Sequence, residues 1–138
     1  MTNTLVSYQD GVQALEGYFV TPNDDARLPG VLVAPTWLNL DKGIRRRTDR
    51  LAAEGFAVFT ADMFGAGIRP APPQSPLSVV APFLSDRHLF RRRLSAGLDA
   101  LRSHCDQEKI AAVGYCLGGC GVLELARSGE LRSEEHTV

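Results

Sequence analysis

The sequence predicts a three-layer α/β sheet that is mostly parallel and begins with an antiparallel hairpin. From Gly30 onward, continuous apolar runs of strand length alternate three times with segments of helical periodicity. Where a helix connects two consecutive strands of one sheet, the strands are parallel and the crossover is right-handed. Before Gly30, two strand-like runs flank Asp10-Gly11, a turn pair typical of two-residue hairpins. The 138 residues are enough for one domain with one core.

The early strands are predicted from their composition. We expect the hairpin strands at residues 4–9 and 12–20, followed by a polar surface turn at residues 22–29. Residues 30–34, GVLVA, form an uninterrupted apolar run, which is typical of a strand buried on both faces.

A second buried strand is predicted at residues 56–62, FAVFTAD. Its last residue, Asp62, is expected to cap the turn that follows. The glycine- and proline-rich residues 65–76 predict a loop across the surface. Pro82 leaves residues 77–84 without an assignment.

Two helices are predicted before the last of the three apolar runs, at residues 42–54 and 85–104. The expected buried face of the first is Ile44, Thr48, Leu51 and Ala52, and that of the second is Phe90, Leu94, Leu98 and Leu101. Each helix carries three consecutive arginines, Arg45–Arg47 and Arg91–Arg93. Consecutive residues fan around a helix, so we expect solvated surfaces here and no nucleic-acid site.

The most informative stretch is residues 109–125, KIAAVGYCLGGCGVLEL. It predicts a strand, a sharp glycine-flanked turn and a helix, the pattern of a nucleophile elbow with Cys116 as the nucleophile. Side chains at Gly114 and Gly118 would collide where the strand doubles back. The helix N-terminus would favour the thiolate of Cys116. A structural cysteine in an ordinary turn is the alternative.

The composition, with 44% hydrophobic and 22% charged residues, is ordinary for a globular protein. The net charge of −1 gives no electrostatic reason to expect nucleic-acid binding, and no apolar run approaches the ~20 residues of a membrane span. The first residues do not resemble a signal peptide. Three cysteines without a framework spacing indicate free thiols, so we expect a cytoplasmic protein.

Several motifs together resemble the dienelactone hydrolase family. They are GYCLGG at residues 114–119, the segment from Gly30 to Trp37 followed by RLAAEGF at 50–56, and ADMFG at 61–65. The resemblance implies an α/β-hydrolase-type sheet, truncated after the elbow helix. It extends over residues 1–131, whereas residues 132–138 form a polar tail of doubtful origin.

The resemblance also implies a chemistry. Cys116 would attack the carbonyl of a small ester or lactone and form a thioester, with a histidine as general base. The backbone N–H groups of Leu117 and Trp37 would form the oxyanion hole, where each donor contributes on the order of 3 kcal/mol. No metal and no cofactor are expected.

The sequence departs from the family in two ways. Thr36 stands where the type enzymes have a glutamate that helps to control the thiol. The acid and histidine of this fold follow the nucleophile on later strands, but after the helix expected at Leu117–Arg127 only a polar segment remains. We do not expect its Glu130, Glu134, Glu135 and His136 to form a triad, and His88 and His104 are expected at the surface. The chain alone is therefore predicted to be nearly inactive.

Two further alternatives remain. Cys116 and Cys120, four residues apart, could form a metal pair, although we expect Cys120 to pack beneath the helix. The chain could also be non-catalytic, binding a ligand at the elbow or pairing with a partner. A strand at 109–113 without a further neighbour would leave an edge open to self-association.

Overall fold

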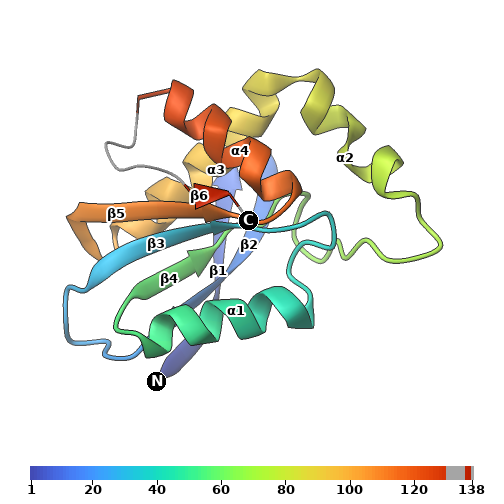
Figure 1. Ribbon diagram of the computed structural model, residues 1–138. Coiled ribbons are helices and arrows are strands. Elements are labelled where there is room, and N and C mark those ends of the chain that lie inside the picture. The colour runs from blue at the N-terminus through green and yellow to red at the C-terminus, as the bar shows by residue number, and fades with distance from the viewer. Residues whose placement is uncertain (130–135, 138) are drawn as a thin grey trace.

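The computed structural model describes residues 1–129 and 136–137 and has a mixed sheet of strand order β1-β2-β4-β3-β5-β6 (Figure 1). The strands are β1 Thr2–Asp10, β2 Gln13–Thr21, β3 Pro29–Ala34, β4 Ala57–Thr60, β5 Asp106–Gly114 and β6 His136–Thr137. The helices are α1 Lys42–Ala53, α2 Pro76–Ser85, α3 Arg87–Arg102 and α4 Leu117–Arg127. This confirms the predicted α/β sheet with its N-terminal hairpin.

The hairpin turn lies one residue later than predicted. Asp10 pairs with Gln13, so Gly11 and Val12 form the turn, and Gly11 has a φ of 58°. Asp10 stays in the strand, where its Oδ2 atom lies 3.0 Å from Nε of Arg93 on α3. Gly11 adopts this positive φ, which such a turn requires, without steric cost.

Helices cover both faces of the sheet, which gives three layers (Figure 1). Helix α1 packs on one face over a cluster of Tyr18, Val20, Val31, Val33, Leu40, Ile44, Ala52 and Val58. Helices α3 and α4 cover the larger cluster on the other face, which includes Phe59, Phe90, Leu94, Leu98, Leu101, Val122 and Leu125. Strand β3 is paired in parallel with both β4 and β5 and is buried between these layers. No helix among the described residues has the length and apolar character that crossing a membrane would require.

The helices predicted at residues 42–54 and 85–104 are confirmed as α1 and α3, and each begins with an aspartate cap. The Asp41 carboxylate accepts a hydrogen bond from the Ile44 N–H (3.0 Å), and Asp86 does the same for the Leu89 N–H (3.1 Å). The four residues expected to form the buried face of α3 are all buried. Ile44, Thr48 and Ala52 are buried on α1, and Leu51 is half-buried.

The segment around Pro82, left unassigned above, forms α2, in which only Phe83 is buried. Proline disfavours a helix interior, and a helix with one buried residue shows no buried stripe in its sequence.

The expectation of a solvated arginine surface is wrong for Arg93. This side chain is buried, donates from Nη1 to the Met63 carbonyl (2.6 Å) and pairs with Asp10. A buried guanidinium requires charge and hydrogen-bond partners, and the hairpin and the β4 loop provide them. Arg92 remains exposed, and Arg91 pairs with Glu124 on α4 (3.6 Å).

The polar segment after α4, whose sequence shows no strand pattern, includes a strand of two residues. His136 and Thr137 form β6 and pair in parallel with Val113 and Gly114 of β5. Two residues can pair through their backbone without an alternating side-chain pattern. The predicted boundary between residues 131 and 132 lies outside the described residues, so the division into 1–131 and 132–138 stays a prediction.

Candidate active site

Cys116 occupies a sharp turn between β5 and α4. Its backbone has a φ of 58° and a ψ of −113°, and its side chain is exposed. For a residue other than glycine this conformation costs on the order of 1–3 kcal/mol and persists only where the surroundings impose it. The strand, turn and helix predicted around Cys116 are therefore present, with the cysteine held in a strained conformation at the N-terminus of α4.

Two glycines permit the turn, as the sequence predicted. A Cβ atom at Gly114 would overlap the backbone of Gly118, where the strand doubles back. A Cβ atom at Gly118 would overlap the carbonyl oxygen of Ala34 and lie 2.7 Å from that of Pro35. The first turn of α4 thus rests directly on the end of β3.

This contact brings the loop after β3 beside the Cys116 turn. The Tyr115 N–H donates to the Ala34 carbonyl (3.0 Å). Trp37 is half-buried in the loop, and Leu117 is buried at the start of α4. Within residues 1–129 and 136–137, neither the Trp37 nor the Leu117 backbone N–H donates to another protein group. Two N–H donors are therefore available on the two segments that meet here.

Thr36 shapes the loop that carries Trp37. Its Oγ1 atom accepts a hydrogen bond from the Leu38 N–H (3.2 Å), and its carbonyl accepts from the Asn39 N–H (2.9 Å). Thr36 thus closes a local turn in the loop after β3. A hydroxyl does not take up a proton at neutral pH, so Thr36 offers Cys116 no base.

Asp62 caps the turn after β4, as predicted. It is fully buried, and its Oδ1 atom accepts hydrogen bonds from the N–H groups of Phe64 (3.1 Å) and Gly65 (3.0 Å). The Asn39 amide also donates to Oδ1 (2.8 Å), and the Glu16 N–H donates to Oδ2 (3.0 Å). These bonds occupy the carboxylate in structural contacts.

Sequence reasoning missed Asn39, which links the β3 and β4 loops. Asn39 is buried, has a φ of 58° and accepts the Met63 N–H through its side-chain oxygen (2.9 Å). The residue type was the available signal, because asparagine is enriched among non-glycine residues with positive φ.

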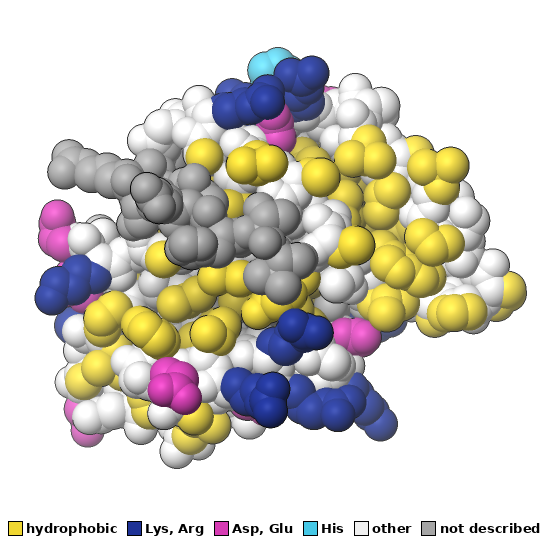
Figure 2. Space-filling view, viewed as in Figure 1, with side chains coloured by type: hydrophobic (Ala, Val, Ile, Leu, Met, Phe, Trp, Pro, Cys, Tyr) yellow, Lys and Arg dark blue, Asp and Glu magenta, His cyan; other side chains and the backbone are white. Residues whose placement is uncertain are grey.

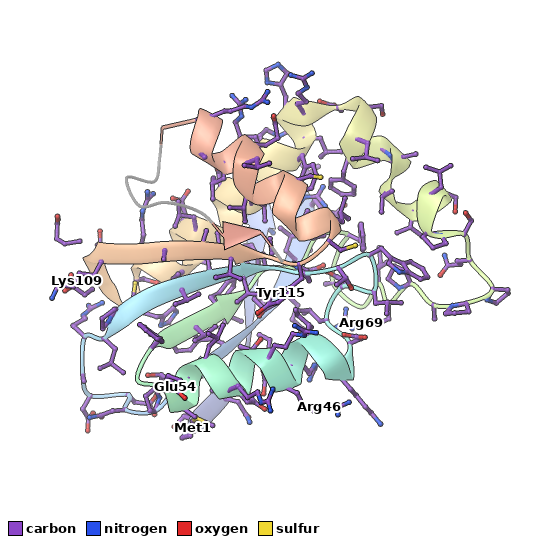
Figure 3. All side chains as sticks on the ribbon, in the orientation of Figure 1. Met1, Arg46, Glu54, Arg69, Lys109 and Tyr115 are labelled. Carbon is purple, nitrogen blue, oxygen red and sulfur yellow. The ribbon has the colours of Figure 1, made fainter. Side chains whose placement is uncertain are left out.

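Tyr115 connects the Cys116 turn to α1. Its ring lies 4.7 Å from the Arg47 guanidinium carbon, a cation–π contact. Figure 3 shows Tyr115 between the sheet and α1. Arg47 is thus more than a solvated surface residue.

The three cysteines differ in exposure. Cys105 is buried, and burial, followed by the nearby Asp106 charge, raises the pKa of its thiol. The prediction that Cys120 packs beneath α4 is wrong, because Cys120 is exposed and Gly121, Val122 and Leu125 form the buried side of the helix. In the described part of the chain, no three His, Cys, Asp or Glu side chains are grouped as metal ligands.

The described histidines are surface residues, as predicted. His88 is exposed in the first turn of α3, and His104 follows the end of that helix with its ring 4.9 Å from that of Phe19. Neither is bonded to Cys116 within the described residues. Glu130, Glu134 and Glu135 lie outside the described residues, as does the side chain of His136.

The chain is similar to a group of known hydrolases. A model of the dienelactone hydrolase family matches residues 15–133. The chain is 28% identical over 111 residues to a bis(hydroxyethyl) terephthalate hydrolase of Streptomyces coelicolor, covering 80% of this chain and 32% of that protein. It is 31% identical over 83 residues to a carboxymethylenebutenolidase homolog of Pongo abelii, covering 59% of this chain and 34% of that protein.

Solved structures match more closely. A dienelactone hydrolase-like promiscuous phosphotriesterase from metagenomic libraries superposes with a TM-score of 0.92 and 36% identity, covering 99% of this chain and 58% of its own. A protein named m3DLH gives a TM-score of 0.87 and 32% identity, covering 93% of this chain and 55% of its own. The chain thus spans about a third of these two curated relatives and somewhat more than half of these two structures.

Proposed function

This chain belongs to the dienelactone hydrolase family, and from that premise we propose that Cys116 is the nucleophile of a hydrolase acting on a small ester or lactone. The observation that carries the proposal is the strained backbone of Cys116, which holds an exposed thiol at the N-terminus of α4. Strain of this kind is concentrated at active sites, and a helix N-terminus favours the thiolate that attacks carbonyl groups.

The proposed reaction has two steps. The Cys116 sulfur bonds to the carbonyl carbon, and the oxyanion accepts hydrogen bonds from the backbone N–H groups of Leu117 and Trp37. The intermediate expels an alkoxide, which takes up a proton, and leaves a thioester on Cys116. Water, activated by a histidine as general base, then releases the carboxylic acid and the thiol.

The second step is expected to be slow in this chain. Neither described histidine is bonded to Cys116, and Thr36 provides no carboxylate. We therefore expect the thioester to accumulate. A relative named for terephthalate ester hydrolysis and another named as a carboxymethylenebutenolidase homolog support the ester or lactone class.

The test is acylation by p-nitrophenyl acetate. We expect one equivalent of p-nitrophenolate, one acetyl group located on Cys116 by peptide mass spectrometry, and little further turnover. Cys116→Ala should abolish the burst, and Cys120→Ala, which removes the other exposed thiol, should preserve it. Acetyl groups spread evenly over Cys116 and Cys120 would exclude Cys116 as the nucleophile. Sustained turnover that depends on Cys116 would refute only the predicted weak activity.

A second candidate function is pairing with a partner through β5. Among the described residues, β6 covers only Val113 and Gly114 of the β5 edge opposite β3. An unpaired strand edge is a template for another strand. Light scattering should then show a mass that rises with protein concentration, and a constant monomer mass would refute this candidate.

A further inference from the structure

Two arginines of α1 stack on tyrosine rings. The Arg45 guanidinium carbon lies 5.1 Å from the centre of the Tyr18 ring, and that of Arg47 lies 4.7 Å from the centre of the Tyr115 ring. Figure 2 shows Lys and Arg side chains gathered over α1, in the lower part of the view. The two contacts are of the same kind, a cation over an aromatic ring, but only Tyr115 is next to Cys116 in the chain.

The Tyr115 side chain is held from α1. It is half-buried and packs against the hydrophobic cluster between α1 and the sheet. Arg47 is exposed, and within residues 1–129 and 136–137 its guanidinium makes no ion pair and no hydrogen bond. The contact with the Tyr115 ring is therefore what orients the Arg47 head group, and the same contact restrains the ring.

The Tyr115 backbone joins the two segments that meet at the Cys116 turn. Its N–H donates to the Ala34 carbonyl at the end of β3 (3.0 Å), and its carbonyl accepts from the Gly118 N–H in the first turn of α4 (3.0 Å). Cys116 follows directly in the chain. A displacement of Tyr115 therefore moves the Cys116 thiol and the Leu117 N–H relative to the loop after β3.

We propose that Arg47 is a positioning residue for Cys116 and acts through the Tyr115 ring. The proposal rests on the function proposed above and adds a residue of α1 to those that set the reaction rate. The Cys116 conformation, with a φ of 58°, persists only where its surroundings impose it. The contact between Arg47 and Tyr115 is one of these restraints, and attack on a carbonyl group depends on such placement of the reacting atom.

The test compares Arg47→Met with Arg45→Met, which each remove one guanidinium group from one tyrosine ring and keep an apolar side chain. The rate at which p-nitrophenyl acetate acetylates Cys116 is followed by peptide mass spectrometry. Arg47→Met should lower this rate by about two- to fivefold, the range that one exposed cation–π contact can supply, and Arg45→Met should leave it unchanged. Alkylation of the buried Cys105 by iodoacetamide should stay equally slow in both variants, which excludes general opening of the fold.

Two further measurements separate positioning from an effect of the Arg47 charge alone. The loss caused by Arg47→Met should be the same factor at about pH 6.5 and about pH 9, because arginine stays charged throughout and the contact acts on geometry. In a Tyr115→Leu background, Arg47→Met should cause no further loss. In a Tyr115→Phe background, which keeps the ring, it should cause the full loss.

The positioning role is overturned if Arg45→Met and Arg47→Met change acetylation alike, if the loss persists in the Tyr115→Leu background, or if it is confined to low pH. In each of these cases the unmodified chain still acetylates Cys116, so the proposed function stands. An unmodified chain that is not acetylated at Cys116 would overturn the proposed function, and the positioning role with it.

Discussion

Gly118 determines how closely α4 approaches the end of β3. The space that a side chain would need there is filled by the backbone of Ala34 and Pro35, which cannot move without shifting β3. Gly43 occupies the same position, the second residue, of α1, but a Cβ atom there would meet only the Asp41 carboxylate at ordinary contact distances. A side chain at Gly118 would therefore overlap the backbone at the end of β3, whereas there is room for one at Gly43.

We predict opposite effects of alanine at these two positions. Gly118→Ala should lower the free energy of unfolding by at least about 3 kcal/mol, because the overlap is with backbone atoms. Gly43→Ala should raise it by roughly 0.5–1 kcal/mol, the usual preference for alanine in a helix. Urea unfolding at neutral pH measures both. Equal effects would mean that the turn at Cys116 does not depend on this close contact.

At the scale of elements, Arg93 joins the hairpin to α3 and to the end of β4. Its guanidinium contacts Asp10 and the Met63 carbonyl and lies 5.6 Å from the Phe83 ring centre. The neighbouring Arg92 contacts Asp10 at 3.6 Å, but its side chain is 62% exposed. Burial rather than charge distinguishes these two arginines.

Removing the buried Arg93 guanidinium from Asp10 should destabilise the fold far more than removing the exposed Arg92 guanidinium. Arg93→Met should lower the free energy of unfolding by about 3–5 kcal/mol, because the largely buried Asp10 carboxylate loses its buried partner and keeps only the exposed Arg92. Arg92→Met should change it by less than about 0.5 kcal/mol. Thermal and urea unfolding provide the measurement. A similar small loss for both variants would show that Asp10 is well solvated without Arg93.

The elements were largely predictable because their signals are local. Continuous apolar runs predicted the buried strands, and the spacing of Phe90, Leu94 and Leu98 predicted α3. The exposure of Cys120 and the burial of Arg93 were not predictable, since both depend on what packs against a helix from elsewhere in the chain. For the same reason, the glycines indicated the Cys116 turn, whereas the residue type of Asn39 could indicate a positive φ but not its hydrogen bond to Asp62.

At the scale of the whole molecule, burial of ionisable groups ties stability to alkaline pH. Burial is the largest cause of a raised pKa at Cys105, where the thiol lies between α3 and β5, and at Tyr8 in the hairpin. The Tyr8 hydroxyl oxygen accepts a hydrogen bond from the Asp62 N–H (2.9 Å) and so connects β1 to the β4 loop. The neutral forms of both groups are part of the folded structure.

We predict that the folded state loses stability as the pH rises above about 8.5, the ordinary pKa of a cysteine thiol. The pKa of Cys105 is raised in the folded state, so between its unfolded and folded pKa values the folded chain holds a proton that the unfolded chain has released. The contribution of the neutral Cys105 thiol to the free energy of unfolding is then fully present below the pKa of the unfolded chain's thiol. Above that pKa it falls by up to about 1.4 kcal/mol per pH unit.

Urea unfolding under reducing conditions between about pH 7 and pH 9.5 tests this linkage, since the range stays below the ordinary tyrosine pKa of about 10. Cys105→Ala should reduce the slope of stability against pH above pH 8.5, whatever constant offset the lost packing adds. Cys120→Ala, which removes an exposed thiol, should leave the slope as it is. If the Cys105→Ala curve runs parallel to that of the unmodified chain, the buried thiol is not a source of the alkaline loss. The α3–β5 junction would then admit water more freely than its burial indicates.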